Sequence, residues 1–229
     1  AASKGVFMGS KKKVAVILAG CGRLDGTEIS EAVCALLSIE LLGAEAVCVA
    51  PRGEFDVRNP VSDKLMGEKR DMILESARIS RGKISEIEAL TPDEIAAAVI
   101  PGGRGTGLNL CNLNLKGASC EVNPELQKFL TQMHEMGKPL CGICLGTVIL
   151  ARSLQLMGVT AGITTGGKGS FAKMVESMGH THIECSPGSC VADDKSGVVT
   201  TPAFMNASSL SEIWPGIQKA VSALLEFAR

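Results

Sequence analysis

The chain has 229 residues, 45% of them hydrophobic, and a formal net charge of −1 at pH 7. This length can bury one substantial core, and the near-neutral balance excludes the general basic surface that nucleic acid partners require. No apolar run reaches the roughly 18 residues of a membrane span, so we expect no membrane contact.

Apolar runs typical of buried strands alternate along the chain with segments of helical composition, several of them closed by glycine. We expect strands at 14–18, 46–50, 86–90, 97–100, 139–143, 182–185, 190–192 and 198–201. We expect helices at 29–42, 68–81, 123–136, 147–157, 171–178 and 209–227, and a further helix that begins at Thr91. This alternation predicts an α/β fold with a mostly parallel sheet that helices cover on both faces.

Residues 1–13 contain four lysines and no acidic residue. We expect a flexible N-terminal segment there, followed by a single domain over 14–229. The segment resembles the tail of a removed transit sequence or an extension added for expression, so the compartment stays open between mitochondrion and cytoplasm. The nine cysteines show no paired spacing, which favours reduced thiols in an intracellular compartment.

Residues 142–146 read Gly-Ile-Cys-Leu-Gly and lie between a predicted strand and a predicted helix. This pattern is typical of a nucleophile elbow, a tight turn that holds its central residue in a strained conformation. A thiol in that position projects beyond the sheet at the positive end of a helix, where thiolate is favoured. Cys144 is therefore the candidate nucleophile.

Two other interpretations of Cys144 are open. Free cysteine is among the most buried residue types, so Cys144 can be an inert core residue. Cys141 and Cys144 also match the redox pattern C-x-x-C. Redox proteins place both cysteines at the helix N-terminus, whereas Cys141 falls inside the predicted strand, which makes dithiol catalysis the weaker alternative.

Three loops that follow predicted strands, at 19–28, 101–107 and the elbow, should open at the same edge of the sheet. The second reads Pro-Gly-Gly-Arg-Gly-Thr-Gly, which allows backbone N–H groups to approach a ligand closely. Next to a nucleophile such groups form an oxyanion hole, and we expect the N–H groups of Gly103 and Leu145 to form it. The glycine spacing fits neither a P-loop nor a dinucleotide fingerprint. Arg104 can steer an anionic substrate or lie in solvent.

Glu28 begins the first predicted helix, and two roles are open for it. In the sequence Asp-Gly-Thr-Glu it can satisfy helix N–H groups as part of a capping box, which the spacing alone favours. Alternatively, its carboxylate points across the strand edge at Cys144 and acts as a general acid and base.

The three histidines give little support for a catalytic triad. His134 lies on a predicted helix, where we expect it at the surface. His182 and Glu184 form the His-x-Glu pattern of glutaminase triads, but a parallel strand that begins there would place His182 at the opposite edge of the sheet. His180 is no better placed.

The segments that carry a family resemblance are Gly20–Ala32, Glu75–Gly82, Pro101–Gly105, Gly142–Gly146 and Val199–Phe204. Together they resemble the ElbB-like branch of the PfpI-type superfamily, which consists of class I glutamine amidotransferase-like proteins. The resemblance covers nearly the whole domain. It implies a flavodoxin-like three-layer sandwich, usually dimeric, with no metal and no organic cofactor.

The resemblance also implies a Cys144 nucleophile, oxyanion donors at Gly103 and Leu145, and an acid partner at Glu28. It thereby makes Glu28 catalytic rather than capping. Further substrate-binding residues are expected in the same loops and in the elbow helix: Cys21, Gly102, Arg104, Gly105 and Thr147. Some members have a histidine where this chain has Thr164 and Thr165, so the missing third partner predicts slow turnover.

The leading hypothesis is a cofactor-free cysteine enzyme of the glyoxalase or deglycase type that acts on small reactive carbonyls. The first alternative is a non-catalytic, redox-responsive or regulatory dimer that uses Cys144 as a sensor thiol. The second alternative is the glutaminase subunit of an amidotransferase, which needs a partner and a histidine.

Overall fold

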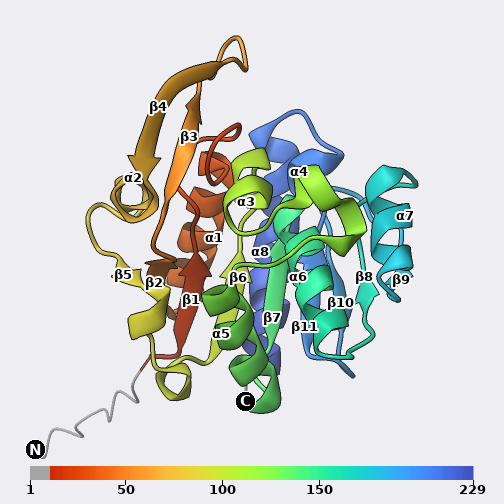
Figure 1. Cartoon of the computed structure of the whole chain (residues 1–229). Helices are drawn as coiled ribbons and strands as arrows, with labels where there is room; N and C mark the ends of the chain where they lie inside the picture. The colour runs from red at the N-terminus through yellow and green to blue at the C-terminus, as the bar shows by residue number, and fades with distance from the viewer. Residues whose placement is uncertain (1–10, 229) are drawn as a thin grey trace, which may run out of the picture.

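The computed structural model describes residues 11–228, and its centre is a seven-stranded sheet with the order β10-β11-β7-β6-β1-β2-β5 (Figure 1). The strands are β1 (Lys13–Ile17), β2 (Glu45–Ala50), β5 (Ser85–Glu86), β6 (Ala97–Ile100), β7 (Leu140–Ile143), β10 (Val191–Asp193) and β11 (Val198–Thr201). All neighbours pair in parallel except β10 and β11, which form an antiparallel hairpin. The predicted α/β fold with a mostly parallel sheet is confirmed.

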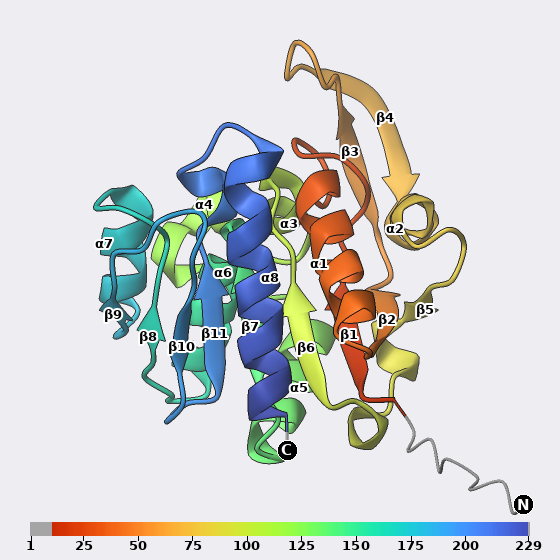
Figure 2. The same cartoon turned by 180° about the vertical axis from the view of Figure 1, so that it is seen from behind.

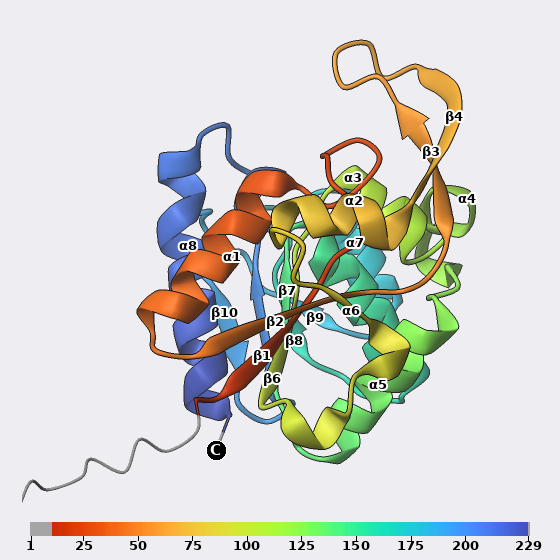
Figure 3. The same ribbon diagram turned by 90° about the vertical axis from the view of Figure 1, so that its left-hand side faces the viewer.

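Helices cover both faces of this sheet. They are α1 (Ile29–Leu41), α2 (Met72–Ile79), α3 (Arg104–Asn109), α4 (Leu113–Lys116), α5 (Pro124–Glu135), α6 (Leu145–Leu156), α7 (Ser170–Ser177) and α8 (Leu210–Phe227). Figures 2 and 3 show α1 and α8 side by side on one face, with α5 and α6 on the other. Strand β1 contributes side chains to both faces of the sheet. Val14 and Val16 pack in the core under α1 and α8, whereas Ala15 and Ile17 pack in the core on the opposite face.

The largest departure from the predicted elements is an antiparallel hairpin, β3 (Glu54–Arg58) and β4 (Leu65–Asp71), which projects from the body of the molecule (Figure 1). The predicted helix 68–81 is wrong in its first part, because α2 begins only at Met72. Asp71 is its N-cap and accepts a hydrogen bond from the Leu74 N–H at 2.8 Å. Every residue of β4 is exposed, so no alternating apolar pattern marks this strand in the sequence.

The remaining elements are short. A two-stranded parallel sheet joins β8 (Gly162–Ile163) to β9 (Thr181–His182), and single turns form at η1 (Ile87–Ala89), η2 (Pro92–Glu94), η3 (Gly117–Ser119) and η4 (Ala203–Met205). The helix predicted from Thr91 is therefore one turn only, and the strand predicted at 86–90 is mostly a turn. The segment predicted as flexible, 1–13, lies outside the described residues up to position 10, and β1 already begins at Lys13.

The carboxyl ends of β1, β6 and β7 meet at one edge of the sheet, which is the upper edge in Figure 1. The three loops singled out in the sequence follow these strands, so they converge as expected. Within residues 11–228, no helix combines the length and the apolar character needed to cross a membrane.

Candidate active site

Cys144 stands between β7 and α6 with φ 53° and ψ −127°, a strained conformation for a residue with a side chain. Its N–H donates to the Thr201 carbonyl at 2.9 Å, which ties the turn to the end of β11. The flanking glycines are required by close packing. A Cβ at Gly142 would lie 2.6 Å from the Thr147 Cα, and one at Gly146 would lie 2.0 Å from the Ile100 carbonyl oxygen. The predicted nucleophile elbow is therefore present.

The carboxylate in contact with Cys144 belongs to Glu31, in the first turn of α1. Its side chain forms a hydrogen bond with the Cys144 thiol. Its two oxygens also accept backbone N–H groups, from Gly102 at 2.9 Å and from Phe204 at 3.3 Å. Glu31 is fully buried, and burial raises its pKa to about 7 while the Cys144 hydrogen bond opposes that rise. A carboxyl group with this pKa can take and return a proton near neutral pH.

Glu28, the predicted acid partner, is the N-cap of α1. Its carboxylate accepts a hydrogen bond from the Glu31 N–H at 2.6 Å, so Glu28 satisfies a helix N–H group, although as the N-cap itself and not as the last residue of the predicted box that begins at Asp25. The structure therefore corrects the predicted contact: Glu28 caps the helix, and Glu31 reaches Cys144. One sequence feature identifies Glu31, because it shares the buried face of α1 with Ala35 and Ser38, where an acid is unusual.

The two predicted oxyanion donors do converge on the thiol. The N–H groups of Gly103 and Leu145 both form hydrogen bonds to the Cys144 sulfur. Gly103 has φ 108°, a conformation that favours glycine. The neighbouring Gly102 has no room for a side chain, since a Cβ there would lie 2.6 Å from the Cys144 Cβ and 2.7 Å from Glu31 Oε2.

The pKa of Cys144 is raised well above its ordinary value. Burial is the largest cause, because the residue is only 9% exposed, and the charge and hydrogen bond of Glu31 act in the same direction. The N–H groups of Leu145 and Gly103 act against them. The expectation of a favoured thiolate at the helix terminus is thus wrong for this state of the site, because burial and a neighbouring carboxylate outweigh the helix end.

The other predicted substrate-binding residues separate into two groups. Gly102 and Thr147 lie in the site, and Thr147 has a buried hydroxyl without a hydrogen-bond partner in the described structure. Gly105 packs against the backbone of the 19–28 loop. Arg104 forms an ion pair with Asp63 at the turn of the β3–β4 hairpin. Cys21 is half-buried, with its pKa raised by burial and then by Glu75.

No histidine appears among the hydrogen-bond partners of Cys144 in the described residues. His180 is buried; its Nδ1 accepts from the Ala161 N–H, and its Nε2 lies 2.8 Å from the Ala151 carbonyl oxygen. Nε2 of His182 lies 3.0 Å from Thr165 Oγ1, beyond the carboxyl end of β8. The prediction that His182 lies at the opposite edge is therefore wrong, because β8 and β9 have only two residues each.

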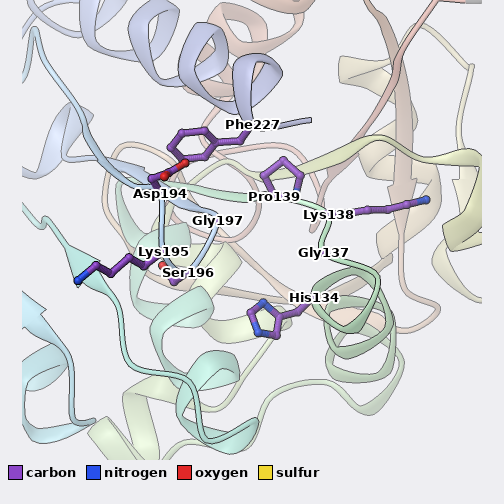
Figure 4. A pocket seen from close by; sticks show the side chains of 9 residues that line it. All are labelled: His134, Gly137, Lys138, Pro139, Asp194, Lys195, Ser196, Gly197 and Phe227. Atoms are coloured by element: carbon purple, nitrogen blue, oxygen red, sulfur yellow. The ribbon is translucent and has the colours of Figure 1, made fainter. Parts of the chain in front are cut away.

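A cavity of about 430 Å³ lies at the amino ends of β7 and β11, the edge opposite Cys144 (Figure 4). His134, Pro139, Gly197 and Phe227 line it, and His134 points toward its centre while Lys138 points away. It does not serve the elbow. Within residues 11–228, no group of three or more His, Cys, Asp or Glu side chains is arranged to hold a metal ion.

Solved structures of other proteins have the same architecture. A solved structure of an isoprenoid biosynthesis protein with an amidotransferase-like domain, from Ehrlichia chaffeensis, superposes with a TM-score of 0.86 at 30% identity, over 94% of this chain and 99% of that one. Drosophila melanogaster DJ-1beta superposes with a TM-score of 0.54 at 16% identity, over 95% and 96%, which shows a shared fold. The chain thus has the flavodoxin-like DJ-1/ThiJ/PfpI fold with a cysteine at its elbow.

Two relatives are similar over most of their length. The human glutamine amidotransferase-like class 1 domain-containing protein 3, mitochondrial, is 36% identical over 93% of this chain and 82% of its own. The rat ES1 protein homolog, mitochondrial, is 37% identical over 94% and 84%. No family model matches the chain. The chain belongs to the ElbB-like family of glutamine amidotransferase-like class 1 and ES1 proteins.

Proposed function

We propose that the protein is a cysteine-dependent, cofactor-free enzyme that acts on small reactive carbonyls, in the manner of a glyoxalase or deglycase. The observation that carries this proposal is the arrangement around one sulfur atom. Glu31 and the N–H groups of Gly103 and Leu145 all hydrogen-bond to Cys144. A thiol with a base on one side and two N–H donors on the other has the parts that addition to a carbonyl needs.

With glyoxal as substrate, the Cys144 sulfur adds to one aldehyde carbon as Glu31 takes the thiol proton. The resulting hemithioacetal oxyanion accepts hydrogen bonds from Gly103 and Leu145. Glu31 then returns its proton to that oxygen, removes the proton from the same carbon and delivers it to the neighbouring carbon, while the hydroxyl proton moves to the oxygen on that neighbouring carbon. The product of this transfer is a thioester of a hydroxy acid, and water hydrolyses it to glycolate and free Cys144.

The raised pKa of Cys144 is compatible with this chemistry, because the thiolate is needed only at the moment of attack. An ionised Glu31 with a pKa of about 7 is a base suited to neutral pH. No third group beside Glu31 relays the proton in the described residues, so slow turnover is expected.

The test measures consumption of glyoxal and formation of glycolate by the parent and three variants. Cys144→Ala should abolish turnover. Glu31→Gln should lower kcat about a hundredfold or more, because it removes the proton carrier. Glu28→Gln is the matched control, with the same change one turn away in the cap, and should retain nearly full turnover. Equal rates for Cys144→Ala and the parent would contradict the proposal.

The same assays decide between this function and its alternatives. If Cys144 serves as a sensor thiol, mild peroxide oxidises it stoichiometrically and no dicarbonyl is turned over. If the protein is a glutaminase subunit, ammonia is released from glutamine, alone or with a partner. The burial of Cys144 and the raised pKa favour the enzyme over the sensor, since peroxide reacts with exposed thiolate.

We also propose that the protein forms a homodimer through α1. Ile29, Val33, Leu37 and Leu41 form an apolar stripe on this helix, each 43–63% exposed. The first two line a groove with Leu210 and Trp214 of α8, the helix that lies beside α1 in Figure 2. Such a stripe can pack against its own copy across a two-fold axis.

Sedimentation or light scattering tests this assembly. Val33→Glu should convert a dimer into monomers, because it buries an unpaired charge at the centre of the stripe. Gln132→Glu, on the exposed side of α5, adds the same charge outside the stripe and should leave the mass unchanged. A monomeric parent would contradict the assembly.

We further propose that the protein resides in mitochondria. The support is that both relatives described above carry mitochondrial names. Fractionation of cells from its source, followed by protease protection of the organelle fraction, tests this. Recovery of the protein only in the cytosolic fraction would contradict it.

A further inference from the structure

A second pair of cysteines lies behind the glycine loop, where two short segments run antiparallel. Cys111 and Val122 form a bridge, the Asn123 N–H donates to the Leu110 carbonyl at 2.8 Å, and the Asn112 N–H donates to the Glu121 carbonyl at 3.3 Å. These bonds hold residues 110–112 against 121–123. The chain between them makes only α4 and one 3-10 turn.

This pairing brings two thiols together. Cys120 is two residues from Val122, so it is the diagonal neighbour of Cys111 on the same face of the ladder, within reach of its side chain. The two thiols form a hydrogen bond with one another. Cys111 Sγ also lies 3.2 Å from the Gly107 carbonyl oxygen, so its single proton is donated either to that oxygen or to the Cys120 sulfur, and this contact connects the pair to α3 and the glycine loop.

The charge around the pair differs from that around Cys144. Nε of Arg152, from the elbow helix α6, donates to the Cys120 carbonyl at 2.8 Å. The hydrogen bond from Cys111 and the positive charge of Arg152 together lower the pKa of the Cys120 thiol. A thiolate beside a protonated thiol is the arrangement from which a disulfide forms after one oxidation.

Both sulfur atoms are buried in the closed structure, so oxidation requires local opening. The intervening segment is suited to it. Most side chains between 113 and 119 are exposed or half-buried, and Leu115 on α4 is 79% exposed. Segments with few buried contacts open locally at a small cost in free energy.

We propose that hydrogen peroxide converts Cys111 and Cys120 into a reversible disulfide, a modification site separate from the elbow. The Cys120 thiolate attacks one peroxide oxygen, the O–O bond breaks, and Cys120 becomes a sulfenic acid as hydroxide leaves and becomes water by taking up the proton that the thiol released. The Cys111 thiol then attacks the sulfenic sulfur, the S–S bond forms, and a second water leaves. Two thiols and one peroxide give one disulfide and two waters, and a dithiol reductant reverses the change.

The inference does not depend on the proposed carbonyl chemistry. Formation of the disulfide removes the proton that Cys111 can donate to the Gly107 carbonyl. Because Gly107 has no side chain, the Leu145 side chain can pack beside it, 2.8 Å from where a Cβ of residue 107 would be. The disulfide therefore forms close to Leu145, which supplies one of the two proposed oxyanion donors. It closes a loop that contains Lys116, which makes it detectable by trypsin.

The experiment treats the folded parent with increasing hydrogen peroxide, blocks free thiols, and digests without reduction. Trypsin cleaves after Arg104, Lys116 and Lys128, so Cys111 and Cys120 fall in different peptides, 105–116 and 117–128. A disulfide joins the two peptides. Cys185 and Cys190 also lie close together, on either side of a turn in which the Ser189 N–H donates to the Ser186 carbonyl at 3.0 Å. Both lie in the single tryptic peptide 174–195, so a disulfide between them does not join two peptides.

The linked peptide should accumulate in the parent and disappear after dithiothreitol. Cys111→Ser should abolish it and drive Cys120 on to sulfinic acid, because the resolving thiol is gone. Cys34→Ser, which removes a half-buried thiol on α1, should leave it unchanged. The inference is overturned if Cys111 and Cys120 stay alkylatable while Cys185 and Cys190 oxidise, or if Cys120 over-oxidises in the parent without forming the link.

Discussion

The buried thiols of Cys144 and Cys120 differ in the direction in which the protein shifts their pKa values. Both are buried and both have a hydrogen-bonded partner, but the partner of Cys144 is a carboxylate and the neighbour of Cys120 is the Arg152 guanidinium. The pKa of Cys144 is raised and that of Cys120 is lowered. Burial raises the pKa of both thiols, and Glu31 adds to that rise at Cys144. At Cys120 the hydrogen bond from Cys111, helped by the positive charge of Arg152, outweighs burial and lowers the pKa.

The difference matters for chemistry. In the proposed function, proton transfer to Glu31 accompanies attack by Cys144, which restricts reaction to molecules that enter the site and orient there. At Cys120, a thiolate is available without a base, so a simple oxidant is enough once the segment opens. The two proposals thus place catalysis at the thiol with the raised pKa and modification at the thiol with the lowered pKa.

Glu31 should make stability depend on pH more than any other single group in the site. Its folded pKa of about 7 exceeds its ordinary 4.5, so between these values the native state binds more protons than the unfolded chain. The free energy of unfolding is therefore highest below 4.5 and falls as pH rises through 7, by about 3 kcal/mol. Urea titrations of the parent and Glu31→Gln over pH 4–8 measure it, and parallel curves would contradict it.

Gly102→Ala should disrupt the elbow without touching its thiol. The added Cβ would meet the Cys144 Cβ, Glu31 Oε2 and the Leu145 N–H, all closer than 3 Å. The site must shift, and a displacement of about 1 Å costs roughly a hundredfold in turnover. Gly169→Ala, where a Cβ meets nothing within 4 Å and φ is −175°, is the matched control. Peroxide linkage of Cys111 to Cys120 should persist in both, and its loss in Gly102→Ala would indicate general misfolding.

How far the sequence predicts this site can be judged from its two glutamates. The apolar runs of β1, β6 and β7 and the glycines around Cys144 predict the sheet edge and the elbow, because buried parallel strands and close-packed turns restrict composition. The spacing before α1 also predicts that Glu28 satisfies helix N–H groups in a capping box that begins at Asp25. Glu28 does accept a helix N–H group, but as the N-cap of α1 and not as the last residue of that box. The family resemblance implies Glu28 as the acid partner of Cys144, whereas in the structure the carboxylate beside Cys144 belongs to Glu31, three residues further on.

What the sequence does not predict depends on tertiary contact. Glu31 reaches Cys144 only because α1, β6 and β7 meet at the edge of the sheet. Cys111 and Cys120 are nine residues apart in an irregular segment, and only the bridge between 111 and 122 brings them together. The β3–β4 hairpin is missed for another reason: every residue of β4 is exposed, so that strand has no apolar period, and the alternation in β3 is only two buried residues long, Phe55 and Val57.

The sharpest test of the comparison reverses each charge effect separately. Glu31→Gln removes the negative charge beside Cys144, so its pKa falls and its alkylation at pH 7 should speed up, roughly tenfold for each pKa unit. Arg152→Gln removes the positive charge beside Cys120, so oxidation of Cys120 at pH 7 should slow and recover at higher pH; the effect should be smaller than that of removing the Cys111 hydrogen bond.

Arg152→Lys keeps the positive charge but loses the planar donor. Cys120 should therefore oxidise at close to the parent's rate in Arg152→Lys but more slowly in Arg152→Gln. Timed alkylation with peptide mapping reads each cysteine in the same sample, so Cys120 serves as the internal control for Glu31→Gln and Cys144 for Arg152→Gln. If both substitutions change the two thiols in the same direction, local unfolding controls their reactivity and neighbouring charge does not. Opposite changes, confined to the thiol beside each substitution, require that the charge next to each sulfur sets its pKa.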